Sequence, residues 1–222
     1  MTLKLGIVGC GGMGFRHMQG ISEVMRHSDI AKLEAICDLH EEAANHVANE
    51  AEKNNGYRPK IYTDFDSMIS ESGIDILDIV TDTKTHHAFA IKAMNKGISV
   101  LTEKPMGITL KACRKMKDVQ EKNNVKLAVA ENYRRDPMNR LVKALIDEGA
   151  IGDLQMVIDV SVSGGGYLMH GTGWRAKKSL AGSLILEQGV HTSDLILYFM
   201  GKAKTIYAKT GVLNPIRKTS GM

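Results

Sequence analysis

The 222-residue sequence has few of the residues that mark a disulfide-bonded protein and no segment that marks a membrane protein. Its three cysteines, Cys10, Cys37 and Cys113, are far apart and have no spacing typical of a metal site. A sparse, odd cysteine count argues against a disulfide framework and fits a reducing compartment. No run approaches about 18 consecutive apolar residues, and no secretory signal opens the chain. The sequence therefore predicts a soluble, cytoplasmic protein with no membrane partner.

Aromatic residues and net charge are also low. Aromatic side chains make up 5% of the chain, and 29 basic against 25 acidic residues give a net charge of +4. The basic residues are scattered and form no stripe interleaved with aromatics, which makes nucleic acid a poor candidate partner. What the sequence does have is 43% hydrophobic residues, enough for one large or two modest domains with buried cores.

Strand-like and helix-like patterns alternate through residues 1–131. The apolar strand candidates are Leu3–Val8, Leu33–Cys37, Ile74–Thr81, Ile98–Leu101 and Lys126–Ala130. The helix candidates between them are Gly14–Arg26, Glu41–Lys53, Thr85–Asn95 and Thr109–Lys122. Apolar strands alternating with amphipathic helices predict an α/β fold, in which helices cover both faces of a parallel sheet. Right-handed crossovers make this a doubly wound Rossmann domain.

The pattern changes over residues 132–222. A helix is expected over Met138–Glu148, a strand over Leu154–Val162, a helix over about Ser183–Met200 and a last strand over Thr205–Val212. These elements predict the start of a second, α+β domain.

Four glycines stand directly after the first strand and at the start of a helix. The spacing Gly9-x-Gly11-x-x-Gly14 in that context is the dinucleotide-binding fingerprint. Its glycines allow a tight turn, a close approach of backbone to a pyrophosphate, and close packing of helix on strand. The N–H groups at the helix N-terminus then bind the phosphates. The residues expected to contact the cofactor in this loop are Gly9, Cys10, Gly11, Gly12, Met13 and Gly14.

Asp38 strengthens this interpretation, because it follows the second strand. The fingerprint has an acid at this place that accepts hydrogen bonds from the adenosine ribose. An acid there disfavours a 2′-phosphate, and no arginine follows it directly, so NAD is expected rather than NADP. The alternative is a structural glycine turn with Asp38 as a helix cap.

The stretch Glu103-Lys104-Pro105, after the fifth strand, resembles the signature of the glucose–fructose oxidoreductase / inositol dehydrogenase (Gfo/Idh/MocA) family. Further stretches resemble that family in the same order: IVTDTKTHHAFAIKAM, ENYRRDPMNRLVKALIDEGAIGDL and GWRAKKSLAGSLILEQGVHTSDLILYFMG. The resemblance spans residues 3 to about 212. It implies an NAD(P)-dependent dehydrogenase that acts on a secondary hydroxyl of a sugar, cyclitol or derivative. It also implies a second domain that packs on the first through an open sheet and often mediates oligomers, here a homo-oligomer. The resemblance implies that the 222 residues hold only the first part of this sheet. Because bare strand edges invite pairing, we expect a fragment of a longer product or, second, a short form that self-associates through this sheet.

The resemblance assigns catalytic roles to Lys104, Glu187 and His191. A histidine is the usual general base near neutral pH, and a lysine stabilises the negative charge that develops on a substrate oxygen. Glu187 is expected to orient the substrate or the histidine, as is Asp194. The resemblance also implies that the Lys104–Pro105 bond is cis. The cofactor contacts expected outside the glycine loop are Asp38, Thr81, His86, Glu103 and Lys104, and the further substrate contacts are Tyr133, Arg134, Trp174 and Arg175.

Structural alternatives remain open for several of these residues. His191 is read as a base or as a core histidine, and His86 as a pocket residue or a helix-start cap. Tyr133 and Arg134 are read as substrate contacts or as interdomain packing, as are Trp174 and Arg175. Glu187 and His191 lie four residues apart, as two metal ligands would, but no third ligand stands at convincing spacing, so no metal is expected.

Two positions depart from the family's pattern. Thr81-Asp82 stands where the family has Thr-Pro, and Glu187 stands where it has aspartate. Two alternative functions follow. One is an NAD-dependent glycosidase that oxidises a sugar transiently, and the other is a non-catalytic dinucleotide-binding regulator.

Overall fold

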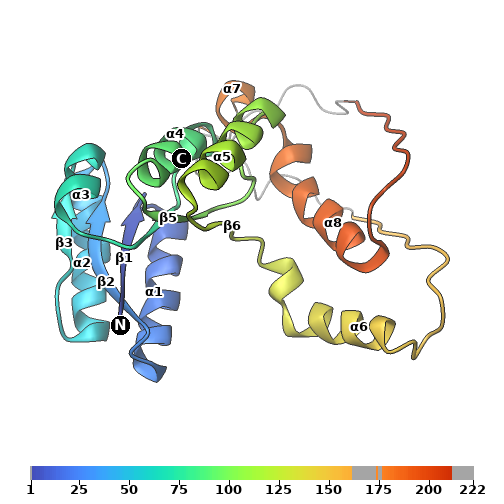
Figure 1. The fold of residues 1–222 in the computed structure, drawn as a ribbon, viewed down its shortest axis with the longest axis horizontal. Helices are drawn as coiled ribbons and strands as arrows, with labels where there is room; N and C mark the ends of the chain where they lie inside the picture. Colours follow the sequence, from blue (N-terminus) through green and yellow to red (C-terminus); the bar gives the residue numbers. More distant parts are fainter. Residues whose placement is uncertain (1, 162–173, 175–176, 212–222) are drawn as a thin grey trace, which may run out of the picture.

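The structure is a computed structural model that describes residues 2–161, 174 and 177–211. Within these residues, no helix is long and apolar enough to cross a membrane. A sheet with helices on both sides forms one end of the molecule, and a helical region lies at the other (Figure 1).

Six parallel strands form the sheet, in the order β3-β2-β1-β4-β5-β6. They are β1 (Leu3–Val8), β2 (Ala31–Cys37), β3 (Lys60–Tyr62), β4 (Ile76–Ile79), β5 (Ser99–Thr102) and β6 (Leu127–Val129). This order confirms the doubly wound α/β fold. It reverses between β1 and β4, and such reversal points are where open α/β sheets bind ligands.

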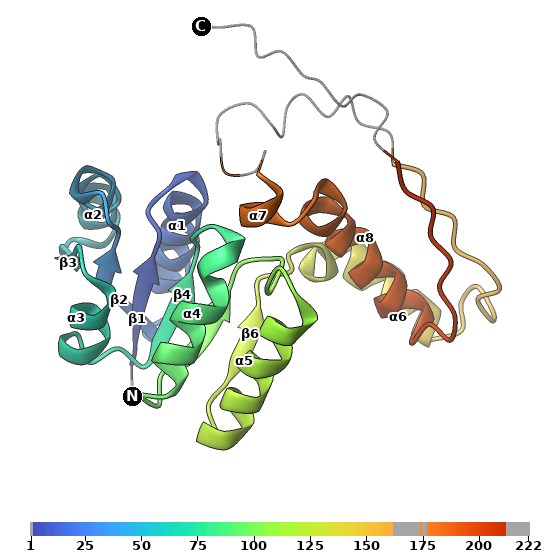
Figure 2. The same cartoon turned by 90° about the horizontal axis from the view of Figure 1, so that it is seen from above.

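Helices cover the sheet on both faces (Figure 2). On one face lie α1 (Gly12–His27) and α2 (Glu41–Asn55), and on the other lie α3 (Phe65–Glu71), α4 (Thr83–Met94) and α5 (Leu110–Asn123). Each layer has its own core. Ile7 packs with Met18 and Ile36 on the α1 side, whereas its neighbour Val8 belongs to the cluster of Met94 and Met116 on the other. Neighbouring residues of one strand serve different cores because strand side chains alternate between faces.

The sequence patterns did not reveal β3 and α3. β3 has three residues and α3 has seven, which is too short for a period of two or of 3.6 to be recognised. The start of α3 did carry a local signal, because the Asp64 carboxylate caps it by accepting the Ser67 N–H at 2.8 Å. An acid three residues before a serine at a helix start is a typical cap.

The chain after the sheet is helical where the structure describes it. A short 3₁₀ helix, η1 (Tyr133–Arg135), leads into α6 (Pro137–Asp147), and α7 (Lys178–Ala181) precedes α8 (Leu184–Met200). The helices expected over 138–148 and 183–200 are thereby confirmed. Ser183 caps α8 by accepting the Leu186 N–H at 3.1 Å. α8 lies against η1 and α6, and α7 lies against α4.

The two strands expected in this second region are wrong over the residues that the structure describes. Residues 154–161 and 205–211 pair with no described strand, and they run on beyond the ends of α6 and α8, on the side away from the sheet (Figure 1). Their apolar side chains are exposed, with Ile158 at 74% and Ile206 at 82%. Alternating apolar residues give a strand its two faces, but a strand also needs hydrogen bonds to a neighbour.

Candidate active site

The glycine loop leaves one side of its backbone open. A Cβ on Gly9, whose φ is +98°, would lie 2.6 Å from the Val80 carbonyl oxygen. A Cβ on Gly14 would lie 1.9 Å from the Gly9 carbonyl oxygen, so these two glycines permit close packing of β4 and α1 on the loop. Gly11 and Gly12 differ, because nothing lies within 4 Å of a Cβ built on either. Their backbone faces space that a ligand can enter.

The start of α1 presents unoccupied donors to that space. Gly11 is the N-cap and supplies no side-chain hydrogen bond, and the first turn of α1 carries no acidic residue. The free N–H groups and positive dipole end of such a helix favour an anion. Cys10 is buried under the loop, whereas Met13 is 38% exposed. The loop therefore fits a diphosphate.

Asp38 is held directly beside the loop by backbone donors. The Cys10 N–H donates to Asp38 Oδ2 at 2.7 Å, and the His40 N–H donates to Oδ1 at 2.8 Å. The strand register explains the placement, because Val8 of β1 pairs with Cys37 of β2, which precedes Asp38. Each carboxylate oxygen keeps a lone pair for a ribose hydroxyl. Asp38 is no helix cap, since the N-cap of α2 is His40.

His86 is fully buried and bonded to backbone. Its Nε2 lies 3.0 Å from the Thr81 carbonyl oxygen and its Nδ1 lies 3.0 Å from that of Pro105. Burial lowers the pKa of the His86 imidazole. The helix-start cap is wrong, because His86 lies inside α4 and Asp82 is the N-cap. The ring thus joins the start of α4 to the turn at Pro105, whose preceding peptide bond is cis.

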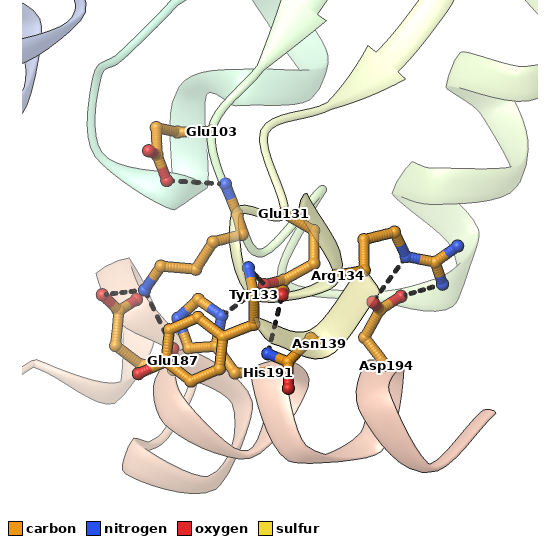
Figure 3. A network of polar contacts seen from close by, with 9 residues as sticks. Glu103, Glu131, Tyr133, Arg134, Asn139, Glu187, His191 and Asp194 are labelled. Atoms are coloured by element: carbon orange, nitrogen blue, oxygen red, sulfur yellow. Dashed lines mark hydrogen bonds and ion pairs between the residues drawn. The ribbon is translucent and has the colours of Figure 1, made fainter. Parts of the chain in front are cut away.

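Lys104 reaches from this turn to α8. Its Nζ donates to Glu187 Oε1 at 3.1 Å and to the Glu187 carbonyl oxygen at 3.0 Å. Its backbone N–H donates to Glu103 Oε2 at 2.8 Å (Figure 3). The Lys104 and Glu187 side chains are 15% and 7% exposed, so water screens this ion pair weakly.

His191 lies one helical turn beyond Glu187 on α8 and is held by a carboxylate that the sequence analysis missed. Its Nδ1 lies 2.7 Å from Oε1 of Glu131, which follows β6 (Figure 3). The Tyr133 N–H donates to the same oxygen at 3.0 Å. The Tyr133 ring stacks on the imidazole, with centroids 4.1 Å apart and planes 14° apart. Both His191 and Glu131 are 6% exposed.

Asp194 has a different partner from the one expected. Its two oxygens accept from Nε and Nη2 of Arg134 at 2.6 Å each, a bidentate pair that joins η1 to α8. These hydrogen bonds raise the pKa of the Arg134 guanidinium. The structure therefore gives the orienting carboxylate of His191 as Glu131, and it makes Arg134 and Asp194 a link between the two elements that carry the site.

Three other residues, Trp174, Arg175 and Thr81, are also expected at the site. Trp174 is half-buried just before α7, and Arg175 lies outside the described residues. The Thr81 and Thr85 hydroxyl groups share a hydrogen bond, with their oxygens 2.7 Å apart. No group of three or more His, Cys, Asp or Glu side chains among the described residues is arranged to hold a metal ion.

Glu131 is the functional candidate that the sequence did not reveal, and its position carries a signal. It stands two residues after β6, at the carboxyl edge of the sheet where Asp38 and Glu103 also lie. Side chains at that edge meet the ligand in doubly wound folds. The open loop and the anchored acid are those of the dinucleotide-binding class of proteins. The half-buried Lys104 and the buried His191 meet at α8, next to this domain.

Comparison with known proteins specifies this class. Residues 3–131 match the model of the oxidoreductase family with an NAD-binding Rossmann fold, and residues 139–219 match the GFO/IDH/MocA C-terminal domain. The chain belongs to the GFO/IDH/MocA family of oxidoreductases. The resemblance found in the sequence motifs is thereby confirmed.

Among curated proteins, levoglucosan dehydrogenase of Pseudarthrobacter phenanthrenivorans is 30% identical over 97% of this chain and 56% of its own. Inositol 2-dehydrogenase 2 of Saccharopolyspora erythraea is 28% identical over 91% and 55%. The WlbA dehydrogenase of Bordetella pertussis, solved with NADH and UDP-GlcNAcA, has a TM-score of 0.82 at 28% identity, covering 96% of this chain and 61% of its own. The chain thus spans little more than half the length of these relatives.

Proposed function

We propose that this protein is an NAD-dependent dehydrogenase that oxidises a secondary hydroxyl of a sugar, a cyclitol or a related derivative. One observation carries the proposal. α8 brings together Lys104 from the cofactor domain and its own His191, and each is bonded to a buried carboxylate. Alcohol oxidation needs a base for the hydroxyl proton and a positive charge beside the developing alkoxide. These two side chains supply both.

The cofactor contacts come from the first domain, over residues 1–131. The Gly11–Gly12 backbone and the N-terminus of α1 bind the diphosphate, with Gly9, Cys10, Met13 and Gly14 shaping the loop. Asp38 accepts hydrogen bonds from the ribose. Thr81 and Glu103 lie at the carboxyl edge beyond it, and His86 acts through the backbone that it holds. NAD held by these residues would supply the hydride acceptor for the carbon that carries the substrate hydroxyl.

His191 takes the hydroxyl proton. Because Glu131 Oε1 is an acceptor, the imidazole Nδ1 carries the proton and donates it to that oxygen, which leaves Nε2 as the acceptor. The stack with Tyr133 fixes the plane of the ring. The histidine is thus held in one tautomer and one orientation, which spares the reaction the cost of ordering the base.

Lys104 binds the substrate oxygen through its ammonium group. Glu187, with one methylene more than the family's aspartate, already reaches Lys104 Nζ and holds it near His191. An ammonium in a site with little water stabilises an alkoxide strongly. Tyr133, Arg134, Trp174 and Arg175 complete the substrate site in this proposal, Arg134 through its pair with Asp194.

The relatives support the substrate class. Their names give levoglucosan and inositol as substrates, and a scyllo-inositol dehydrogenase of Lactobacillus casei was solved with NAD(H) and scyllo-inositol. That structure is 28% identical, with a TM-score of 0.73 over 90% of this chain and 57% of its own. We extend the proposal to a cytoplasmic homo-oligomer that associates through its second domain, residues 132–222.

The test is a screen of sugars and polyols for NAD reduction, made with the full-length product of the gene and followed by NADH absorbance. The proposal expects NADH to accumulate with at least one secondary alcohol. Net hydrolysis of a glycoside without NADH accumulation would indicate the glycosidase instead. Tight NADH binding without reduction across the whole panel would indicate a regulator and contradict the proposal.

The preference for NAD over NADP has its own test. Asp38→Asn removes the charge that opposes a 2′-phosphate, so the ratio of NADPH to NADH affinity is expected to rise at least about tenfold. Asp75→Asn is the matched control, because Asp75 also accepts a backbone N–H, from Lys4 at 2.8 Å, away from the loop. An unchanged ratio in Asp38→Asn would remove Asp38 from this role.

A further inference from the structure

His17, a residue with no role in the proposal above, connects the cofactor-binding helix to the turn that carries Lys104. It lies on α1, one turn after Gly14, and its side chain is 16% exposed. Its Nδ1 is 2.8 Å from Oδ2 of Asp78 on β4, and its Nε2 is 3.1 Å from Oε1 of Glu103 after β5. Thus one imidazole bridges two carboxylates from neighbouring strands.

This geometry fixes the charge of His17. A neutral imidazole has one N–H and donates to one carboxylate, whereas an imidazolium donates to both. Asp78 and Glu103 are 2% and 9% exposed, so without a cation between them two carboxylates would be buried side by side. Burial alone lowers the pKa of His17, but the hydrogen bonds and charges of Asp78 and Glu103 outweigh it and raise the pKa to about 10.

The bridge continues directly into the proposed catalytic group. Burial raises the pKa of Glu103, but the hydrogen bond and charge of His17, together with the Lys104 N–H, outweigh it, and the pKa falls below its ordinary value. One Glu103 oxygen accepts from His17, and the other accepts from the Lys104 backbone N–H at 2.8 Å. The position of the Lys104 backbone therefore depends on where His17 holds the Glu103 carboxylate.

We propose that His17, as an imidazolium, is a positioning residue that ties α1 to the Glu103–Lys104 turn and thereby sets the place of the Lys104 ammonium. The same helix binds the diphosphate at its N-terminus, so one rigid element aligns the cofactor and the lysine. The bridge stands on the geometry alone. The effect on catalysis rests on the proposed function.

A purely structural role, in which His17 only balances buried charge, makes a different prediction. His17→Gln removes the cation and leaves two buried carboxylates, so the protein is expected to lose stability. His17→Gln combined with Asp78→Asn removes one of those charges. If His17 only balances charge, the double variant recovers both stability and kcat. If His17 positions Lys104, stability recovers but kcat stays low, because Glu103 still lacks its partner.

The first readout requires no substrate. Nitrogen-15 NMR of the full-length protein is expected to show both His17 ring nitrogens protonated at neutral pH. The Lys104 backbone amide signal is expected to shift in His17→Gln, because its acceptor Glu103 is released. His27→Gln is the matched control: His27 lies on the same helix and contacts Glu23 at 2.9 Å, but both side chains are exposed. That variant is expected to leave the Lys104 signal in place.

The second readout is kinetic. His17→Gln is expected to lower kcat by about 100-fold, the cost of a displacement of about an ångström, while the Kd for NADH stays unchanged. A neutral His17 at neutral pH, an unmoved Lys104 amide, or a kcat restored in the double variant would each overturn the inference. If no substrate is oxidised, the proposed function fails, and the NMR result still decides the inference.

Discussion

Two parts of the candidate site use different atoms. The glycine loop faces open space with backbone N–H groups and the bare Cα atoms of Gly11 and Gly12. Where the sheet domain meets α8 the candidate groups are side chains, and each depends on a carboxylate far away in the sequence. Glu131 and His191 are 60 residues apart, and Lys104 and Glu187 are 83 apart. A backbone site needs only the correct local spacing, whereas a side-chain site needs the complete tertiary structure.

The burial of apolar side chains differs between the sheet domain and the helical region that follows it. The sheet domain buries its apolar residues in two cores, one on each face. In the second region, by contrast, α6 leaves Met138 65% and Leu141 52% exposed in the described structure. The side chains of Glu131, Glu187 and His191, where α8 meets the sheet domain, are nevertheless buried, and Lys104 is half-buried. The polar contacts of α8 are thus more protected from water than the apolar side chains of α6.

Removal of the proposed base should give the largest effect. His191→Ala is expected to lower kcat by about 10²- to 10⁴-fold, because no other group takes the hydroxyl proton. The Kd for NADH, measured by fluorescence titration, should not change, since the glycine loop belongs to β1 and α1 and not to α8. An unchanged kcat would show that the role of His191 is structural and not catalytic.

Two variants of the glycine loop distinguish its role in packing from its role in cofactor binding. Gly14→Ala forces a Cβ to within 1.9 Å of the Gly9 carbonyl oxygen, so it is expected to cost about 1–3 kcal/mol of unfolding free energy. Gly11→Ala meets no atom within 4 Å and should change stability by less than about 1 kcal/mol. It should still weaken NADH binding, since the new methyl group occupies the space of the diphosphate. Urea unfolding and NADH titration of both variants make the measurement, and equal NADH affinity in Gly11→Ala and wild type would contradict the loop's role.

The positioning carboxylate should matter less than the base. Glu131→Gln keeps the size of the side chain but weakens its bond to His191 Nδ1, and kcat is expected to fall about tenfold with the Kd for NADH unchanged. Glu121→Gln is the control, because Glu121 forms only an exposed pair with Lys117 on α5. If both variants kept full kcat, the orientation of His191 would have to come from its stack with Tyr133.

The last prediction concerns the pH dependence of stability in the sheet domain. The pKa of His17 is raised from 6.5 to about 10, so the folded state holds a proton that the unfolded chain releases between these values. This contribution is fully present below pH 6.5 and is lost as the pH rises through about 10. Unfolding free energy is expected to fall by at most about 1.4 kcal/mol per pH unit within that window. Denaturant unfolding of wild type and His17→Gln at several pH values tests this, and equal slopes would contradict it.

The sequence predicted the sheet domain well because its signals are local. Each apolar strand, glycine spacing and helix is read within about 20 residues, and right-handed crossovers then predict a doubly wound domain. It failed at β3 and α3, which are too short to show a period, and at residues 154–161 and 205–211. There the apolar alternation was present, but pairing depends on a second strand and not on the segment itself.

The sequence by itself determined the fold class, the diphosphate loop, the place of Asp38 and the identity of Lys104 and His191 as candidates. Only the tertiary structure decided which carboxylate pairs with which basic side chain. It gave Glu131 to His191, Glu187 to Lys104, Asp194 to Arg134, and both Asp78 and Glu103 to His17. The physical reason is that a glycine loop works through backbone geometry over six residues. A buried ion pair forms only where folding brings two distant side chains to the same place away from water.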